Sequence, residues 1–198
     1  AEVGARLLGT TAGARSATPA DWTREIEAAL GRKGPLAPRQ AAAGRALQIA
    51  LAAGWQDSRT AFSWFAVGKL AAGTDPARAL DAFDQAAAIY GRFPGGQVQL
   101  AHVDMQLAAM ALAAGLPDEA ARIAERAIPA VRAQGNAALL ATLMLIEAEA
   151  LERLGDSAGA AALRLDSAPY ARYGFGPDSV VAARMRDIAA VANRADNG

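Results

Sequence analysis

Cysteine is absent from the 198 residues, and histidine occurs once, at His102. The missing thiol excludes disulfide bonds, thiolate metal sites and cysteine nucleophiles. A lone histidine cannot form a histidine-rich zinc site, and its acidic neighbour Asp104 lies at i+2, on a different face of a helix. We therefore predict no metal site, no cofactor and no enzymatic activity.

An excess of charge of one sign is also missing. The chain carries 20 basic and 20 acidic residues, for a formal net charge of zero. Because nucleic-acid-binding domains usually carry a basic surplus or stripe, we predict no nucleic-acid partner. Carboxylates spaced i, i+3, such as Asp81 with Asp84 and Glu149 with Glu152, are expected on solvated helix faces rather than in an acid–base site.

Long apolar runs are missing as well. The most apolar stretch, 137–151, contains Glu147 and Glu149 and is shorter than the roughly 20 residues of a membrane-spanning helix, so we predict no such helix. Ala1 fits the small residue left by signal-peptide cleavage. The alanine, arginine and glycine bias is typical of GC-rich bacterial genomes. We predict a bacterial, periplasmic protein, with the cytoplasm as the alternative.

Aromatic residues make up only 6 % of the chain, and β-branched residues are few and scattered, which disfavours a sheet. Hydrophobic residues reach 53 %, and alanine supplies much of that share. Alanine favours helices because it loses no side-chain rotamer entropy on ordering and hides no polar group. The composition therefore predicts an all-α fold held together by close packing of small side chains.

Start and stop signals divide the chain into helices. Residues 1–18 show no sustained helical period and are expected to form an extended arm, followed by a single domain over 19–198. Thr18 is the expected N-cap of the first helix, with Pro19 in its first turn. Pro129 should kink or shorten the sixth helix. The expected helices are 19–30, 37–53, 58–72, one ending near 90, 97–114, one ending near 133, 137–154, a short one ending near 165 and, after a loop at 167–178, a last one at 178–192.

Three glycines punctuate the chain at similar intervals. Gly73, Gly115 and Gly155 each follow a long apolar helix, and each is followed within a few residues by aspartate and a second helix. This is a helix–turn–helix unit that repeats every 40 to 42 residues. Self-similarity at a fixed period indicates a solenoid.

The units resemble tetratricopeptide repeats, although their period exceeds the family's usual value of about 34 residues. Glycine ends the first helix of each unit, and small or aromatic residues follow at the family's spacing in the second. The matching residues are Ala79, Phe83 and Ala86 after Gly73, then Ala120, Ala124 and Ala127 after Gly115, Ala160 after Gly155, and Trp64, Val67 and Gly68 in a first helix; Arg164 departs from the pattern.

This resemblance covers about residues 58–166. It implies a right-handed α-solenoid of about four antiparallel helical hairpins, with 19–54 as a degenerate first hairpin and the last helix as a C-terminal cap. It further implies that the first helices of successive hairpins line a concave groove. In this register the lining residues are Thr60, Ser63, Val67, His102, Met105, Thr142, Leu145 and Glu149.

The aromatic cluster Tyr170, Tyr173 and Phe175 falls in the expected loop at 167–178. It has two interpretations, a packed loop that seals the last hairpin or an aromatic anchor for a partner protein.

The mildly polar groove suits a peptide or a partner helix. We therefore expect a non-enzymatic protein–protein interaction module, or an accessory or assembly subunit of a larger complex. The alternative is a small-molecule-sensing regulatory domain, in which Trp22, Trp55 and Trp64 line a pocket.

Overall fold

The computed structural model describes residues 18–31, 34–176 and 179 of the chain. This part of the chain contains eight α-helices and no strand, which confirms the all-α fold. The helices are α1 (Pro19–Leu30), α2 (Leu36–Ala52), α3 (Ser58–Ala71), α4 (Pro76–Tyr90), α5 (Gln97–Ala113), α6 (Pro117–Gln134), α7 (Ala137–Leu154) and α8 (Ser157–Phe175).

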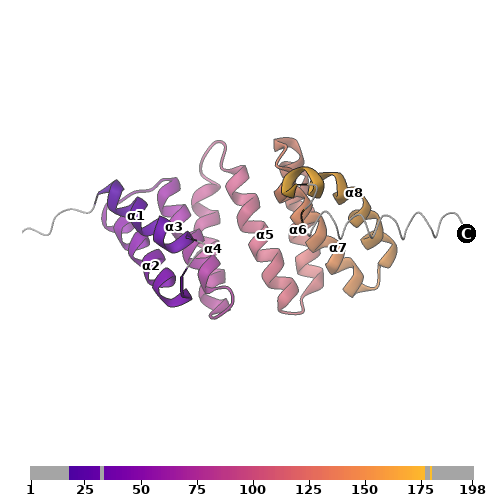
Figure 1. The fold of residues 1–198 in the computed structure, drawn as a ribbon, viewed down its shortest axis with the longest axis horizontal. Helices are drawn as coiled ribbons and strands as arrows, with labels where there is room; N and C mark the ends of the chain where they lie inside the picture. Colours follow the sequence, from indigo (N-terminus) through magenta and orange to yellow (C-terminus); the bar gives the residue numbers. More distant parts are fainter. Residues whose placement is uncertain (1–17, 32–33, 177–178, 180–198) are drawn as a thin grey trace, which may run out of the picture.

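The helices follow one another along the long axis of the molecule, and each packs against the next one in the chain (Figure 1). Consecutive helices form four hairpins, α1–α2, α3–α4, α5–α6 and α7–α8. Apart from these neighbours, α1 contacts α3 and α5 contacts α7. Because contacts remain local along the sequence, the arrangement is a solenoid-like stack rather than a bundle around one centre.

The helix starts follow from their capping residues. At α1 the backbone N–H of Thr18 donates to Asp21 Oδ2 at 2.9 Å, and the N–H of Asp21 donates to Thr18 Oγ1 at 3.3 Å. This reciprocal capping box satisfies two N–H groups that the helix leaves open, and Pro19 occupies the first turn as expected. Hydrogen bonds from Thr18 and then from Arg24 lower the pKa of Asp21 to about 2.

Small side chains lie where the two helices of each hairpin approach each other. The expected packing positions Ala79, Ala86, Ala120, Ala124 and Ala160 have no exposed surface. Helices can approach to about 8–10 Å only where such residues occupy the contact. The alanine content of the chain therefore supports the close packing of its hairpins.

Gly68 is the tightest of these contacts in the second hairpin. A Cβ added to Gly68 of α3 would lie 2.8 Å from Cε1 of Phe83 on α4, well inside an ordinary carbon–carbon contact. Phe83 is completely buried and packs against Phe65, with their ring centroids 5.8 Å apart. Glycine at this position therefore leaves room for the largest fully buried side chain of the hairpin.

The joint between the second and third hairpins differs from the others. The contact between α4 and α5 is the smallest between consecutive helices, and α3 and α5 do not pack closely on each other. Val103 of α5 is nevertheless completely buried in the core that α3 and α4 form around Phe83. The third and fourth hairpins have a separate core, centred on α6 and α7.

One expectation about the C-terminal half was wrong. Residues 167–175 do not form a loop, because α8 continues through Pro169 to Phe175. Helix α6 ends at Gln134, close to the expected end near residue 133, and Pro129 does not shorten it. In both helices proline removes one backbone donor, yet packing of neighbouring residues such as Val131 and Ala171, which are completely buried, keeps the helix in place.

The expected arm at 1–18 lies outside the described residues except for Thr18, and the expected last helix at 178–192 lies outside them except for Ser179.

Candidate binding face on the odd-numbered helices

The first three residues of the expected groove are in the core instead. Thr60, Ser63 and Val67 of α3 are 3 %, 0 % and 5 % exposed, so they cannot line an open surface. The expectation was wrong because the register on α3 was displaced. Phe62 and Phe65 lie on the side of α3 that the groove was expected to occupy, and both are only partly buried.

Ser63 has a structural role that explains its burial. Its Oγ accepts a hydrogen bond from Trp22 Nε1 of α1 at 2.8 Å and donates to the carbonyl oxygen of Arg59 at 2.8 Å. The Trp22 ring makes an edge contact with Trp55, and the Arg59 guanidinium lies 3.7 Å from the centroid of the Trp55 ring. These contacts connect α1 with α3, so Trp22 and Trp55 contribute to packing between the first and second hairpins.

A pocket of about 190 Å³ opens between α3 and α5, and we name it the α3–α5 pocket. It lies at the joint where these two helices are not closely packed. The rings of Phe62 and Phe65 are stacked, with centroids 6.2 Å apart and planes 17° apart. The pocket is lined by Phe62, Phe65, Tyr90, Val98, Gln99 and His102.

Tyr90 closes the α3–α5 pocket from the last turn of α4. Its side chain is 4 % exposed, and burial raises the pKa of its hydroxyl to about 12. Among the described residues the hydroxyl has no hydrogen-bond partner, and no buried side-chain polar atom in that part of the chain is left both enclosed and unpaired. The hydroxyl of Tyr90 is therefore accessible, and Tyr90 is one of the residues that line the pocket.

His102 is the one expected groove residue that reaches this pocket. Its Nδ1 lies 2.9 Å from the carbonyl oxygen of Val98, one turn earlier on α5. In the neutral ring Nδ1–H donates to that carbonyl, so Nε2 carries the lone pair and can accept a hydrogen bond. Gln99, an exposed residue beside it, adds an amide that can both donate and accept.

A second pocket, of about 270 Å³, lies where α7 faces the ends of α5 and α8, and we name it the α7–α8 pocket. It brings together Thr142, Leu145 and Glu149, as the groove hypothesis expected. Glu149 is held by Arg153 at 3.1 Å and lies 3.8 Å from Arg164. The pocket is lined by Leu112, Thr142, Leu145, Ile146, Glu149 and Phe175.

The expected groove residues that line pockets are therefore divided between two separate pockets, His102 in one and Thr142, Leu145 and Glu149 in the other. Met105 lies between them on α5, where it is partly buried and packs against the core around α6 and α7. Spacing alone did not identify Tyr90, which comes from a second helix. The pair Phe62 and Phe65, at i and i+3 on one helix, was the available signal for the aromatic wall.

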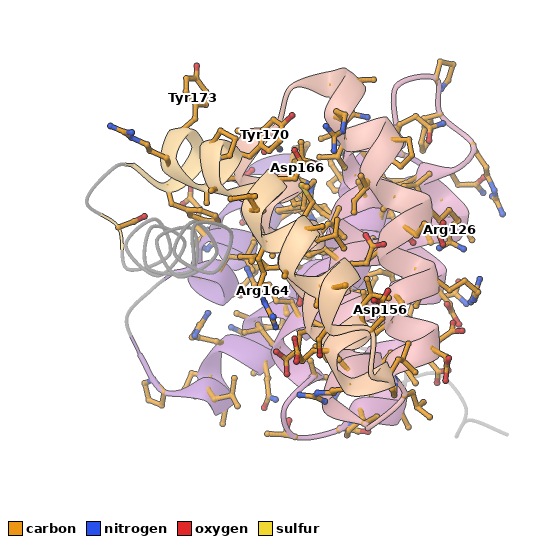
Figure 2. All side chains as sticks on the ribbon, turned by 90° about the vertical axis from the view of Figure 1, so that its right-hand side faces the viewer. Arg126, Asp156, Arg164, Asp166, Tyr170 and Tyr173 are labelled. Carbon is orange, nitrogen blue, oxygen red and sulfur yellow. The ribbon has the colours of Figure 1, made fainter. Side chains whose placement is uncertain are left out.

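The aromatic cluster near the C-terminus is divided by the helix that carries it. The Tyr170 hydroxyl accepts a hydrogen bond from Arg132 at 3.1 Å, and Arg132 also pairs with Asp166 at 3.2 Å. Tyr173 is 85 % exposed and projects away from the body, as Figure 2 shows, whereas Phe175 lines the α7–α8 pocket. The three residues do not form one anchor, because a helix directs them to different sides.

Tyr170 and Tyr173 border a third pocket, of about 330 Å³, at the α6–α7 turn. The α8 end is held close to that turn by Gly174, where an added Cβ would lie 2.4 Å from the backbone nitrogen of Ala138. The aromatic residues thus seal the last hairpin in part, as one interpretation of the sequence proposed, while Tyr173 remains exposed.

Glu149 is the one carboxylate among the residues that line these three pockets. Glu147 of α7 has a pKa raised above its usual value by burial and by the nearby Glu125 of α6. Among the described residues no three His, Cys, Asp or Glu side chains are grouped so that they could hold a metal ion. The described polar groups on this face are suited to hydrogen bonding with a ligand.

Across residues 18–31, 34–176 and 179, no helix combines the length and hydropathy needed to cross a membrane. No protein-family model matches the sequence, and no curated protein shows significant similarity to it.

Proposed function

We propose that the chain is a non-enzymatic interaction module of tetratricopeptide-like hairpins that binds a protein or peptide partner. The binding surface is the odd-helix face, which we define by residues from α3, α5 and α7. Its members are Phe62, Phe65, Val98, Gln99, His102, Thr142, Leu145 and Glu149. The observation that carries the proposal is the occurrence of two largely apolar pockets between successive odd-numbered helices.

The contacts between helices support this choice of face. Among the described helices, α1 contacts α3 and α5 contacts α7, whereas the even-numbered helices make no comparable contacts with one another. A stack curves toward the layer whose members lie closer together. Although α3 and α5 do not pack closely on each other, the α1–α3 and α5–α7 contacts support placing the odd-numbered helices on the inner side of the stack, where helical repeat proteins have their extended concave binding surfaces.

The chemistry of the face favours an apolar partner segment over a highly charged one. Glu149 is neutralised by the neighbouring Arg153 and Arg164. The remaining members are aromatic, aliphatic or uncharged polar residues. Such a surface suits an amphipathic helix or an extended peptide that inserts apolar side chains at intervals.

The regulatory alternative rests on small-molecule capture. The three pockets described above measure about 190, 270 and 330 Å³, at or below the lower end of the range for drug-sized ligands, which is about 300–1,000 Å³. Pockets of this size fit single side chains better than whole metabolites. A thermal-shift screen with metabolites tests this alternative, and a large specific stabilisation would favour it.

The experiment for the interaction module compares two matched double variants in affinity purification followed by mass spectrometry. Gln99→Arg with Leu145→Arg alters the odd-helix face. Gln85→Arg with Leu80→Arg makes the same changes at exposed positions of α4.

We expect a specific partner to be captured by the unaltered chain and by the α4 variant, and to be lost from the face variant. Circular dichroism must show that both variants keep their helix content. A partner retained equally by both folded variants contradicts the proposal.

A further inference from the structure

The α3–α5 pocket contains a polar group that the fold does not use. Tyr90 is 4 % exposed, and its hydroxyl has no hydrogen-bond partner among the described residues. Because no enclosed side-chain polar atom in that part of the chain lacks a partner, this hydroxyl is accessible, so its hydrogen bond comes from water or from a ligand. Tyr90 lines the pocket, so a ligand bound there could take the place of water as the partner of the hydroxyl.

The volume of the pocket accommodates one ring. Its volume of about 190 Å³ is close to the engineered cavity of about 150 Å³ that takes up benzene. The stacked rings of Phe62 and Phe65 form a flat apolar wall, and Phe65 is supported from behind by the buried Phe83. Offset or edge contacts with these rings favour an aromatic ligand over an aliphatic chain of equal volume.

The polar groups around the pocket specify what the ring should carry. The Tyr90 hydroxyl can donate or accept, and the Nε2 of His102 can accept, because Nδ1 is engaged by Val98. A phenolic hydroxyl both donates and accepts, so it complements this pair, whereas an unsubstituted ring leaves both unpaired. No carboxylate lines the described pocket, so a quaternary ammonium ion would have only the aromatic faces to neutralise it.

We propose that the α3–α5 pocket binds a phenol ring, either as a free small molecule or as the side chain of a tyrosine in a bound peptide. The ring packs against Phe62 and Phe65, and its hydroxyl exchanges hydrogen bonds with Tyr90 and His102. The peptide source rests on the proposed function, because it makes tyrosine the residue by which a partner engages the odd-helix face. The free-ligand source does not depend on that function.

The first test is an NMR titration of the ¹⁵N-labelled full chain with p-cresol, toluene and choline. We expect p-cresol at millimolar concentration to shift the signals of the Gln99 side-chain amide and the His102 backbone amide. Toluene should bind several-fold more weakly, and choline should cause no such shifts. Binding of choline in preference to p-cresol, or no shift with p-cresol at these two residues, overturns the proposal.

The second test uses Tyr90→Phe, which removes the hydroxyl and keeps the ring. One hydrogen bond between uncharged groups corresponds to a loss of about 3- to 10-fold in p-cresol affinity, with toluene binding unchanged. The matched control is Tyr173→Phe, the same change at the 85 % exposed tyrosine of α8, which should alter neither affinity. An unchanged preference for p-cresol in Tyr90→Phe contradicts the assigned role of the hydroxyl.

The third test separates the two sources of the ring. Capped tyrosine amide and capped phenylalanine amide are titrated in the same way. Tighter binding of the tyrosine compound supports the peptide source. Binding of p-cresol together with no binding of capped tyrosine overturns the peptide source and leaves a small-molecule site.

Failure of the phenol-binding proposal can be distinguished from failure of the proposed function. Leu145→Arg alone leaves the α3–α5 pocket intact, so loss of partner capture in that variant reports on the odd-helix face independently of phenol binding. Val98→Phe fills the pocket and should abolish p-cresol and toluene binding together. If that variant does not fold, Tyr90→Phe still decides the proposal because it changes only one oxygen atom.

Discussion

Substitution of Gly68 by alanine tests the close approach of α3 and α4. The new Cβ would lie 2.8 Å from Phe83 Cε1, whereas ordinary carbon contacts are about 3.5–4.0 Å, so the ring would have to move away by about 0.7–1.2 Å. Phe83 is completely buried and rests on Phe65, so the ring has little room to do so. Overpacking of this kind costs about 1–3 kcal/mol.

The higher helix propensity of alanine opposes the overpacking cost, and substitution of a second glycine allows that opposing effect to be measured alone. Alanine is about 0.8–1.0 kcal/mol more favourable than glycine inside a helix. At Gly44, in the interior of α2, an added Cβ meets no atom within 4 Å, so Gly44→Ala should show the propensity gain alone. Gly68→Ala should instead show a net loss of up to about 2 kcal/mol in the free energy of unfolding.

Thermal unfolding followed by circular dichroism at 222 nm is a suitable assay. For a chain of this length 1 kcal/mol corresponds to about 2–4 °C in Tm. Gly44→Ala should raise Tm by about that amount, and Gly68→Ala should lower it by up to about 4–8 °C. Phe83→Leu in the Gly68→Ala background should recover part of the loss by opening space for the new methyl group. An equal rise in Tm for the two alanine variants refutes the packing argument.

Three further predictions follow from other contacts. Gly174→Ala places a Cβ 2.4 Å from the backbone nitrogen of Ala138, so the end of α8 should separate from α7. Hydrogen–deuterium exchange should become faster at residues 170–176 and 137–140 and should remain unchanged in α1–α4. The pKa of Asp21 is lowered from 3.8 to about 2, so the contribution of its carboxylate to stability is present above about pH 4 and is lost as the pH falls toward 2. Asp21→Asn should therefore reduce the decline of Tm across that pH window. An identical decline in the variant and the unaltered chain contradicts this prediction. The pKa of Glu147 is raised by burial and by Glu125, so its ionised form opposes folding. Glu147→Gln should raise Tm at pH 7, and it should reduce the gain in Tm that the unaltered chain shows when the pH is lowered through the pKa of Glu147. A lower Tm of the variant at pH 7 contradicts this interpretation.

The sequence was sufficient for features that depend on a few adjacent residues. The start of α1 depends on Thr18 and Asp21, which lie three residues apart and satisfy each other. The ends of α6 and α7 depend on Gly135 and Gly155, whose φ angles of 72° and 89° favour glycine. Local chemistry of this kind can be recognised without knowing what packs nearby.

Features that depend on residues far apart in the sequence could not be predicted in the same way. Ser63 is buried because Trp22, 41 residues earlier, donates to it, and nothing in the sequence around Ser63 indicates this. Helix α8 continues through Pro169 because its end packs against α7 at Gly174, although Pro and Gly together are typical of a loop.

The candidate site shows the same division. Thr142, Leu145 and Glu149 follow the helical period of one element, and the structure brings them into one pocket as expected. Tyr90 belongs to the last turn of a different helix from His102 and Phe62, and only the α4–α5 joint brings the three together. A site composed of several helix ends requires knowledge of their relative placement.

The small contact between α4 and α5 has a consequence for how unfolding would be observed. In a chain whose elements touch mainly their sequence neighbours, cooperativity passes from one hairpin to the next through each interface, and it is weakest at the smallest one. All three tryptophans, Trp22, Trp55 and Trp64, precede that interface, so fluorescence reports on α1–α4, whereas circular dichroism averages over every helix. The two optical probes can then give different midpoints, one for unfolding of α1–α4 and one averaged over all the helices.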